Sequence, residues 1–111
     1  MSPDDVIRIR HMVEAIDLAS TFVEGRGPDE LKSNAMLRLA LTRAVEIVGE
    51  AAARVSAEGR SSAPDLPWAA MIGMRNRLVH AYFDVDCEIL WTTVTDSLPR
   101  LAVQLKALFP V

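Results

Sequence analysis

The stretch from Asp29 to Ala57 limits the fold most, because it carries apolar side chains on two adjacent faces of one predicted helix. These two faces are Leu31, Ala35, Leu41, Val45, Val48, Ala52 and Val55, and Leu37, Ala40, Ala44, Ile47 and Ala51. A helix with two apolar faces packs against neighbours on two sides. The stretch therefore predicts a long central helix, in which Gly49 would let another helix approach closely.

Helical patterns are also found on both sides of this stretch. The acceptor-rich segment Ser2–Asp5 suits a helix N-terminus, and the amphipathic pattern after it predicts a first helix that Gly25–Pro28 would end. The segment Ser56–Leu66 has the composition of a loop. Pro67 would then begin a third helix, which we expect to continue toward Tyr82.

The last part of the chain predicts a helix with a defect. Phe83–Asp86 is typical of a turn, and Asp86 is a candidate N-cap. An apolar row then continues across Pro99, which forfeits a backbone hydrogen bond and predicts a kink or break, with Ser97 capping the piece that follows. The 111 residues allow one domain, 1–111. We expect an all-α fold, a compact bundle of four to five helices with a core of Leu, Ile, Val, Ala and Met.

Composition excludes several classes of protein. The net charge of -3 argues against binding nucleic acid through a broad basic face, although a small basic cleft remains compatible with it. Cys87 is the single cysteine, so neither an internal disulfide nor a structural zinc site is expected. The acidic start and the lack of a membrane-spanning run favour a cytoplasmic protein that does not contact membranes.

The segment Met74–Phe83 is where we expect any chemistry. If the third helix extends through it, Asn76 and His80 would lie one turn apart, and Arg75 and Tyr82 two turns apart on one side. An imidazole beside an always-charged arginine suits phosphoryl chemistry. Two structural explanations stay open: cations are favoured at a helix C-terminus, and Tyr82 could be an ordinary core residue.

Three further charged residues need an explanation. Glu46 and Glu50 are like charges one turn apart, which is unfavourable unless Arg43, Arg54 or a group outside this helix compensates. An intrahelical ladder of charges is the simpler interpretation. His11 lies on the first helix beside Arg8 and Arg10, where a solvated face explains it and a direct role in a site is the alternative.

The pattern Arg75-x-x-x-x-His80-x-Tyr82, with Asn76 after the arginine, resembles the signature of the HEPN superfamily. The match is specifically to the HepT-like toxins of HEPN–MNT toxin–antitoxin pairs. Further similar segments, in the right order along the chain, are Glu46–Ala52, Pro67–Trp68, Met74–His80, Leu90–Trp91 and Asp96-x-Leu98-Pro99-x-Leu101.

The resemblance implies a homodimeric, metal-independent endoribonuclease of HEPN fold whose paired motifs line a cleft between subunits. His80 would transfer protons, Arg75 would stabilise charge on the phosphate, and Asn76 would orient the reacting groups. Arg77 and Glu46 are possible auxiliary residues. Ala81 stands where many members carry Asp, which leaves the local electrostatics and the reaction rate open.

The resemblance also implies partners. The substrate would be RNA, either tRNA or mRNA, and attack by the 2′-hydroxyl would exclude DNA. Because such cleavage needs both a base and an acid, two chains would supply one histidine each. The MNT-type nucleotidyltransferase antitoxin would transfer AMP to Tyr82, which would place negative charge in the cleft and block RNA.

An alternative function keeps the same fold without catalysis. The chain would then be a helical module that docks beside a nucleotidyltransferase or binds a nucleotide, with Arg75, Asn76 and His80 as anion ligands or as part of the dimer contact. Asp84 and Asp86 are better explained as turn and cap residues than as metal ligands. No cofactor or metal is expected in either case.

Overall fold

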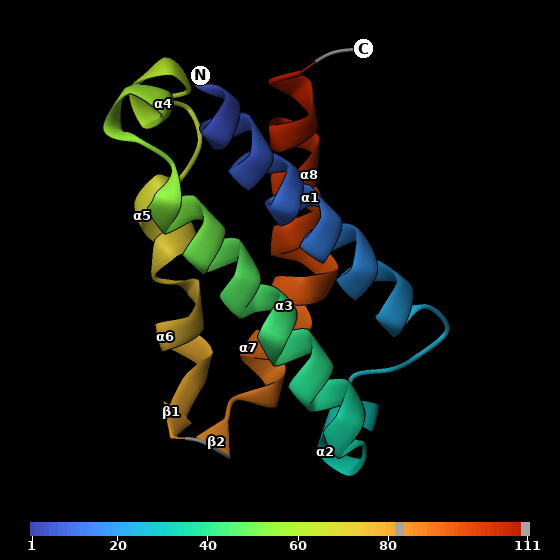
Figure 1. Ribbon diagram of the computed structural model, residues 1–111. Coiled ribbons are helices and arrows are strands. Elements are labelled where there is room, and N and C mark those ends of the chain that lie inside the picture. Colours follow the sequence, from blue (N-terminus) through green and yellow to red (C-terminus); the bar gives the residue numbers. More distant parts are fainter. Residues whose placement is uncertain (82–83, 110–111) are drawn as a thin grey trace.

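Helix α3 (Ala35–Arg54) is the central element of the fold, and helices from both before and after it in the chain pack against it (Figure 1). The computed structural model describes residues 1–81 and 84–109, and of residues 80 and 81 the backbone only. Helix α1 (Pro3–Val23) lies along α3, and α8 (Leu98–Ala107) packs against α1. The prediction of an all-α bundle with a central helix packed on more than one side is confirmed.

Aliphatic side chains make up the core, as the low aromatic content predicted. The largest fully buried side chains are Ile9, Met12, Ile16, Leu31, Leu41, Met71, Leu78, Leu90, Leu98, Leu105, Val45 and Val48. The close approach predicted at Gly49 is also confirmed, because a Cβ there would lie 3.2 Å from the carbonyl oxygen of Met71. That carbonyl belongs to α5 (Trp68–Ile72), which packs on α3. Gly49 thus brings the third helical segment close to the centre of the fold.

The long helix predicted from Asp29 to Ala57 is divided at Asn34. A short helix α2 (Glu30–Ser33) precedes the break, and Asn34 has extended backbone angles, φ −116° and ψ 95°. Its side-chain oxygen accepts a hydrogen bond from the N–H of Leu37 at 3.0 Å. The prediction of one uninterrupted helix was wrong because this N-cap lies within a continuous apolar pattern, and periodicity does not reveal it.

The third predicted helix is also shorter than expected. It consists of α5 and α6 (Met74–Leu78), which meet at Gly73, and the chain is extended from Val79 onward. Val79–Ala81 forms β1, which pairs antiparallel with β2 (Asp84–Val85). The backbone of His80 therefore lies in a strand, and the helical stacking predicted for Asn76 and His80 is wrong. The helix ends where the chain begins to pair with Asp84–Val85, and the local sequence does not predict this pairing.

The C-terminal helix has the predicted irregularity before Pro99. Helix α7 (Cys87–Thr92) continues into a π-helical turn over Thr93–Ser97 and then into α8. Within the turn the N–H of Leu98 donates to the carbonyl of Thr93, five residues earlier, instead of the usual four. The wider turn accommodates the proline ring and its missing donor. Ser97 has helical backbone angles and makes no side-chain cap, so that prediction was wrong.

The segment predicted as a loop contains α4 (Ala57–Ser62), tied to the start of α1. Ser56 caps α4 by accepting from the N–H of Gly59 at 3.0 Å, and it donates to Asp5 from its backbone nitrogen at 2.8 Å and from Oγ at 2.6 Å. These hydrogen bonds hold the pKa of the Asp5 carboxyl below its ordinary value. The predicted caps at Ser2 and Asp86 are both formed.

A helix that crosses a bilayer must be about 20 residues long and predominantly apolar. Within the described ranges, no helix is both long enough and apolar enough to cross a membrane.

Candidate active site

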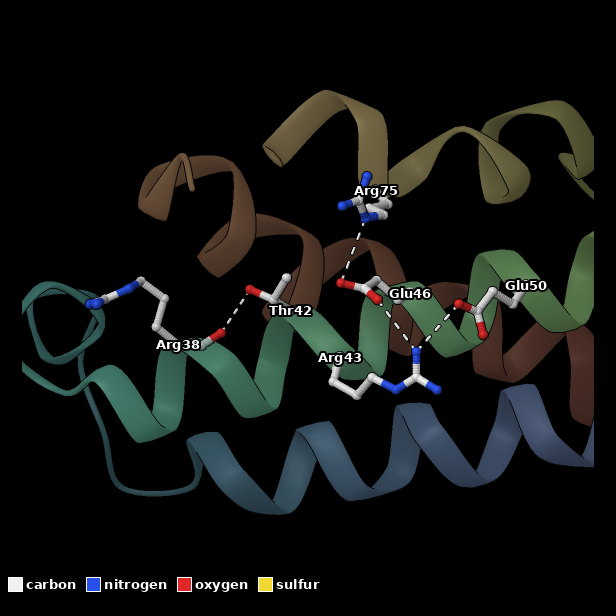
Figure 2. Close-up of polar contacts among 6 residues, drawn as sticks. All are labelled: Arg38, Thr42, Arg43, Glu46, Glu50 and Arg75. Carbon is white, nitrogen blue, oxygen red and sulfur yellow. Dashed lines mark hydrogen bonds and ion pairs between the residues drawn. The ribbon is translucent and has the colours of Figure 1, made fainter. Parts of the chain in front are cut away.

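Arg75, the first residue of the predicted motif, lies on α6 facing α3. Its Nε is 3.6 Å from Oε1 of Glu46, which makes an ion pair rather than a hydrogen bond (Figure 2). The side chain of Arg75 is 47% exposed, and its two Nη atoms donate no hydrogen bond to the part of the chain that the structure describes. Arg75 is thus held on one edge of its guanidinium and open on the other.

The two glutamates that are one turn apart are compensated both within α3 and from outside it. Nη1 of Arg43 lies 3.3 Å from Glu46 and 3.3 Å from Glu50 (Figure 2). The ladder within the helix therefore exists, and Arg75 adds a partner from a second helix. Glu46 joins the two arginines, so that Arg43, Glu46 and Arg75 form one charged network between α3 and α6.

Beside this network is a groove of about 300 Å³ between α3 and the strand pair. It is lined by Ala35, Arg38, Leu39, Thr42, Arg43, Glu46, Arg75, Val79 and Val85. Val79 and Val85 face each other in the antiparallel pair, and Val79 directly precedes His80. The groove therefore runs beside the strand that carries His80, with cationic side chains along its α3 and α6 walls.

Arg38 is a groove residue that the sequence did not single out. Its Nη1 donates to the carbonyl oxygens of Leu31 at 2.7 Å and Lys32 at 3.3 Å, so the side chain is fixed against the end of α2. Thr42 donates to the carbonyl of Arg38 at 2.7 Å, as Figure 2 shows. The signal that could have found Arg38 is the four-residue spacing of positions 38, 42 and 46, which places three polar side chains on one face of α3.

The other predicted site residues are only partly brought together. Asn76 is exposed on α6, and Nη2 of Arg77 donates to the carbonyl of Ala70 at 3.1 Å. The backbone of His80 lies beside the groove, whereas Tyr82 lies outside the described residues. Within the described part of the chain, Arg75 and Glu46 are the two predicted site residues in direct contact, and their pairing was not predicted.

This arrangement is suited to an anion. Guanidinium groups bind phosphate oxygens through paired N–H donors and stay charged at every physiological pH. The apolar surface of Leu39, 58% exposed, and of the two valines would contact the uncharged part of the same ligand. In the described part of the chain, no three His, Cys, Asp or Glu side chains are grouped to hold a metal ion.

The fold is that of a small helical bundle with an arginine-lined groove, which suits an anionic ligand. Residues 12–108 match the model of the family described as HepT-like ribonucleases, so the chain belongs to this family of the HEPN superfamily. The match covers most of the chain and includes both sides of the groove.

Curated relatives agree with that family. A protein of Methanocaldococcus jannaschii, named as a candidate RNase, is 37% identical over 78 residues, 70% of this chain and 72% of the relative. A protein of Thermococcus cleftensis, named as a candidate HepT ribonuclease, is 34% identical over 93 residues, 84% of each chain. One from Caldanaerobacter subterraneus, also named as a candidate RNase, is 31% identical over 98 residues, 88% of each chain. No solved structure matches the chain.

Proposed function

We propose that this chain is a metal-independent endoribonuclease that cuts tRNA or mRNA in the cytoplasm, as the toxin of a HEPN–MNT toxin–antitoxin pair. The observation that carries the proposal is the position of Arg75: it is held by Glu46, open on its Nη edge, and lines the groove beside the strand of His80. Membership of the HepT-like ribonuclease family supports RNA as the ligand of this groove.

The reaction is an attack of the ribose 2′-hydroxyl on the adjacent phosphorus. A base removes the hydroxyl proton, the bond from phosphorus to the 5′-oxygen breaks, and an acid protonates that oxygen. The products are a 2′,3′-cyclic phosphate and a 5′-hydroxyl. In this scheme His80 transfers protons, Arg75 stabilises the charge on the phosphorane, and Asn76 orients the phosphate. Arg77 adds local positive charge. DNA lacks the 2′-hydroxyl and is not cut.

Two chains act together in the proposal. The scheme needs a base and an acid, and each chain offers one histidine in this motif. A homodimer with the two grooves facing each other would supply both groups, and the side chain of Leu39, which lines the groove and is 58% exposed, would be covered in such a contact.

Regulation would come from a nucleotidyltransferase of the MNT type. We expect it to transfer AMP from ATP to the hydroxyl of Tyr82, two residues after His80, with release of pyrophosphate. The added phosphodiester would bring negative charge to the arginines and exclude RNA. Intact-mass measurement after incubation with the partner and ATP tests this. An unchanged mass, or an adduct that maps away from Tyr82, would remove the claim.

The first experiment is cleavage of total tRNA and a defined mRNA in EDTA, by the unmodified chain and by His80→Ala. We expect cleavage by the wild type, products ending in 2′,3′-cyclic phosphate, and no cleavage by the variant. Arg100→Ala is the control, because Arg100 is exposed on α8 and lies outside the groove. If a folded, unmodified wild type cuts neither RNA, the proposal fails and the non-catalytic binding module replaces it.

A further inference from the structure

A second hollow lies on the opposite side of Arg43 from the groove. It has a volume of about 160 Å³ and lies between α1 and α3. Four of the side chains that line it are basic, two from each helix: Arg8, His11, Arg43 and Arg54. Two chain segments that are far apart in the sequence thus direct guanidinium and imidazole groups to one place.

The charge of this hollow is opposite to that of the whole chain. The chain has a net charge of -3, yet three arginines here face one carboxylate, that of Glu50, which is already paired with Arg43. Arg8 and Arg54 make no ion pair with the carboxylates that the structure describes. Like charges gathered in one hollow repel one another, and a bound anion would offset this repulsion.

The dipole of α3 explains only part of the cluster. Arg54 is in the last turn of α3, where a cation is favoured by the helix dipole. Arg8 is in the first half of α1, where the dipole gives no such preference. The convergence of Arg8 with Arg54 therefore needs a cause outside either helix, and a ligand shared by both helices supplies one.

Arg43 connects this hollow to the candidate active site. It lines both the hollow and the groove, and it contacts Glu46, the partner of Arg75. Figure 2 shows Arg43 on the side of α3 that faces α1, with Arg75 on the other side of Glu46. A strand of RNA that leaves the groove on this side would pass over Arg43 into the hollow.

We propose that the hollow of Arg8, His11, Arg43 and Arg54 binds a backbone phosphate of the RNA strand whose reacting phosphate lies at Arg75. The inference rests on the proposed ribonuclease function and extends it to a binding site away from the reaction. Guanidinium groups from two helices would bind the phosphate oxygens, and the hollow would read no base sequence. It would add affinity and direct the strand across α3.

The test is binding of a fluorescent, fully 2′-O-methylated single-stranded RNA, which cannot be cut, over a series of salt concentrations. The test variant is Arg8→Gln/Arg54→Gln. The matched control is Arg10→Gln/Arg100→Gln, which removes the same charge from exposed arginines outside the hollow. Arg10 lines a separate pocket between α1 and α8, away from both the groove and the hollow. Cleavage of a dinucleotide is measured in parallel, because its one phosphate would lie at Arg75 and leave none for the hollow.

We expect the test variant to bind the RNA about tenfold more weakly, as for a lost charge-assisted contact. The plot of log affinity against log salt should be shallower by about 0.7, the value for one phosphate contact on a single strand. The control should bind like the wild type, and both variants should cut the dinucleotide like the wild type.

Two results would overturn the inference. In the first, the test variant keeps the affinity and the salt dependence of the wild type. In the second, the test and control variants lose affinity equally, which indicates a general effect of charge. Failure of the ribonuclease proposal is separate, because it would appear as a wild type that cuts neither substrate, while the binding comparison would still decide whether the hollow contacts the strand.

Discussion

Two polar clusters of the molecule are each built on one carboxylate. Asp5 lies where α1 meets α4, and Glu46 lies beside Arg75 where α3 meets α6. The two clusters differ in whether hydrogen-bond donors remain available to a ligand. Asp5 is 3% exposed and receives two hydrogen bonds from Ser56 at 2.6 and 2.8 Å. Glu46 is 26% exposed at its side chain, and Arg75 is 3.6 Å away with its Nη atoms free of hydrogen bonds within the described residues.

The difference separates a structural cluster from a binding one. A buried carboxylate with matched donors ties two segments together and has nothing to offer a ligand. An exposed arginine that is held on one edge keeps its other donors for a ligand and adds little to stability. Changes at Asp5 should therefore act on folding, and changes at Arg75 on cleavage.

The largest effect is expected at Arg75. Arg75→Ala should lower kcat/KM for RNA by about 10²–10³-fold, as for the loss of one donor to a developing negative charge. Arg75→Lys should recover only part of this, because an ammonium lacks the paired donors of a guanidinium. The melting temperature should change little, since the ion pair with Glu46 is exposed. If Arg75→Ala lowered the melting temperature as well as kcat/KM, Arg75 would have a structural role like that of Asp5, and the proposed difference between the two clusters would be wrong.

The next effect is on stability, at Asp5. Asp5→Asn should lower the melting temperature by several degrees, because an amide has one acceptor oxygen in place of the two that Ser56 engages. Asp4→Asn is the control, since Asp4 is the exposed acid of the same helical turn. Cleavage measured well below the melting temperature should be that of the wild type. A variant that keeps its stability and loses cleavage would contradict the structural role.

The same cluster should show itself in the pH dependence of stability. The folded pKa of Asp5 is lowered from an ordinary value near 3.8 by the hydrogen bonds from Ser56. Its contribution is therefore fully present above that ordinary value and is lost as the pH falls through the depressed folded pKa. Melting curves of the wild type and Asp5→Asn from neutral to acid pH should converge below the ordinary value. Curves that remain parallel throughout would exclude this role for ionised Asp5.

The smallest effect is expected at Glu46, which acts through Arg75. Glu46→Gln should lower kcat by about three- to tenfold with little change in KM, because about 1 kcal/mol of positioning is lost. Glu50→Gln is the matched control, since Glu50 contacts Arg43 and has no contact with Arg75. Equal effects of the two changes would show that the net charge of α3 matters, and that the contact with Arg75 does not.

Local signals in the sequence predicted the ends of several helices correctly. Ser2 and Asp86 each accept from the N–H three residues later, as their residue types indicated. Such caps involve neighbours in the sequence, so they can be read without knowledge of the fold. Asn34 is of the same kind and was missed, because the apolar rows on both sides of it indicated one helix.

Features that depend on contacts between separate elements were mostly not predicted, with the close approach at Gly49 as the exception. The third helix ends at Leu78 because Val79 pairs with Val85, and no local pattern indicates that pairing. The partner of Glu46 was left open for the same reason, since Arg75 follows 29 positions later in the numbering and on another helix. Arg38 was missed because its donors meet backbone carbonyls, which every residue possesses.

The π-helical turn over Thr93–Ser97 has a consequence for how the chain tolerates changes in length. Such a turn holds one residue more than an α-helical turn of the same height. The buried residues Leu90 and Val94 before Pro99, and Leu101 and Leu105 after it, still share one core. One residue can therefore be removed from this turn without changing which side chains of α8 face the core. Deleting Thr95 together with Pro99→Ala should restore a regular α-helix. A deletion inside α8 should instead rotate every later side chain out of its core position.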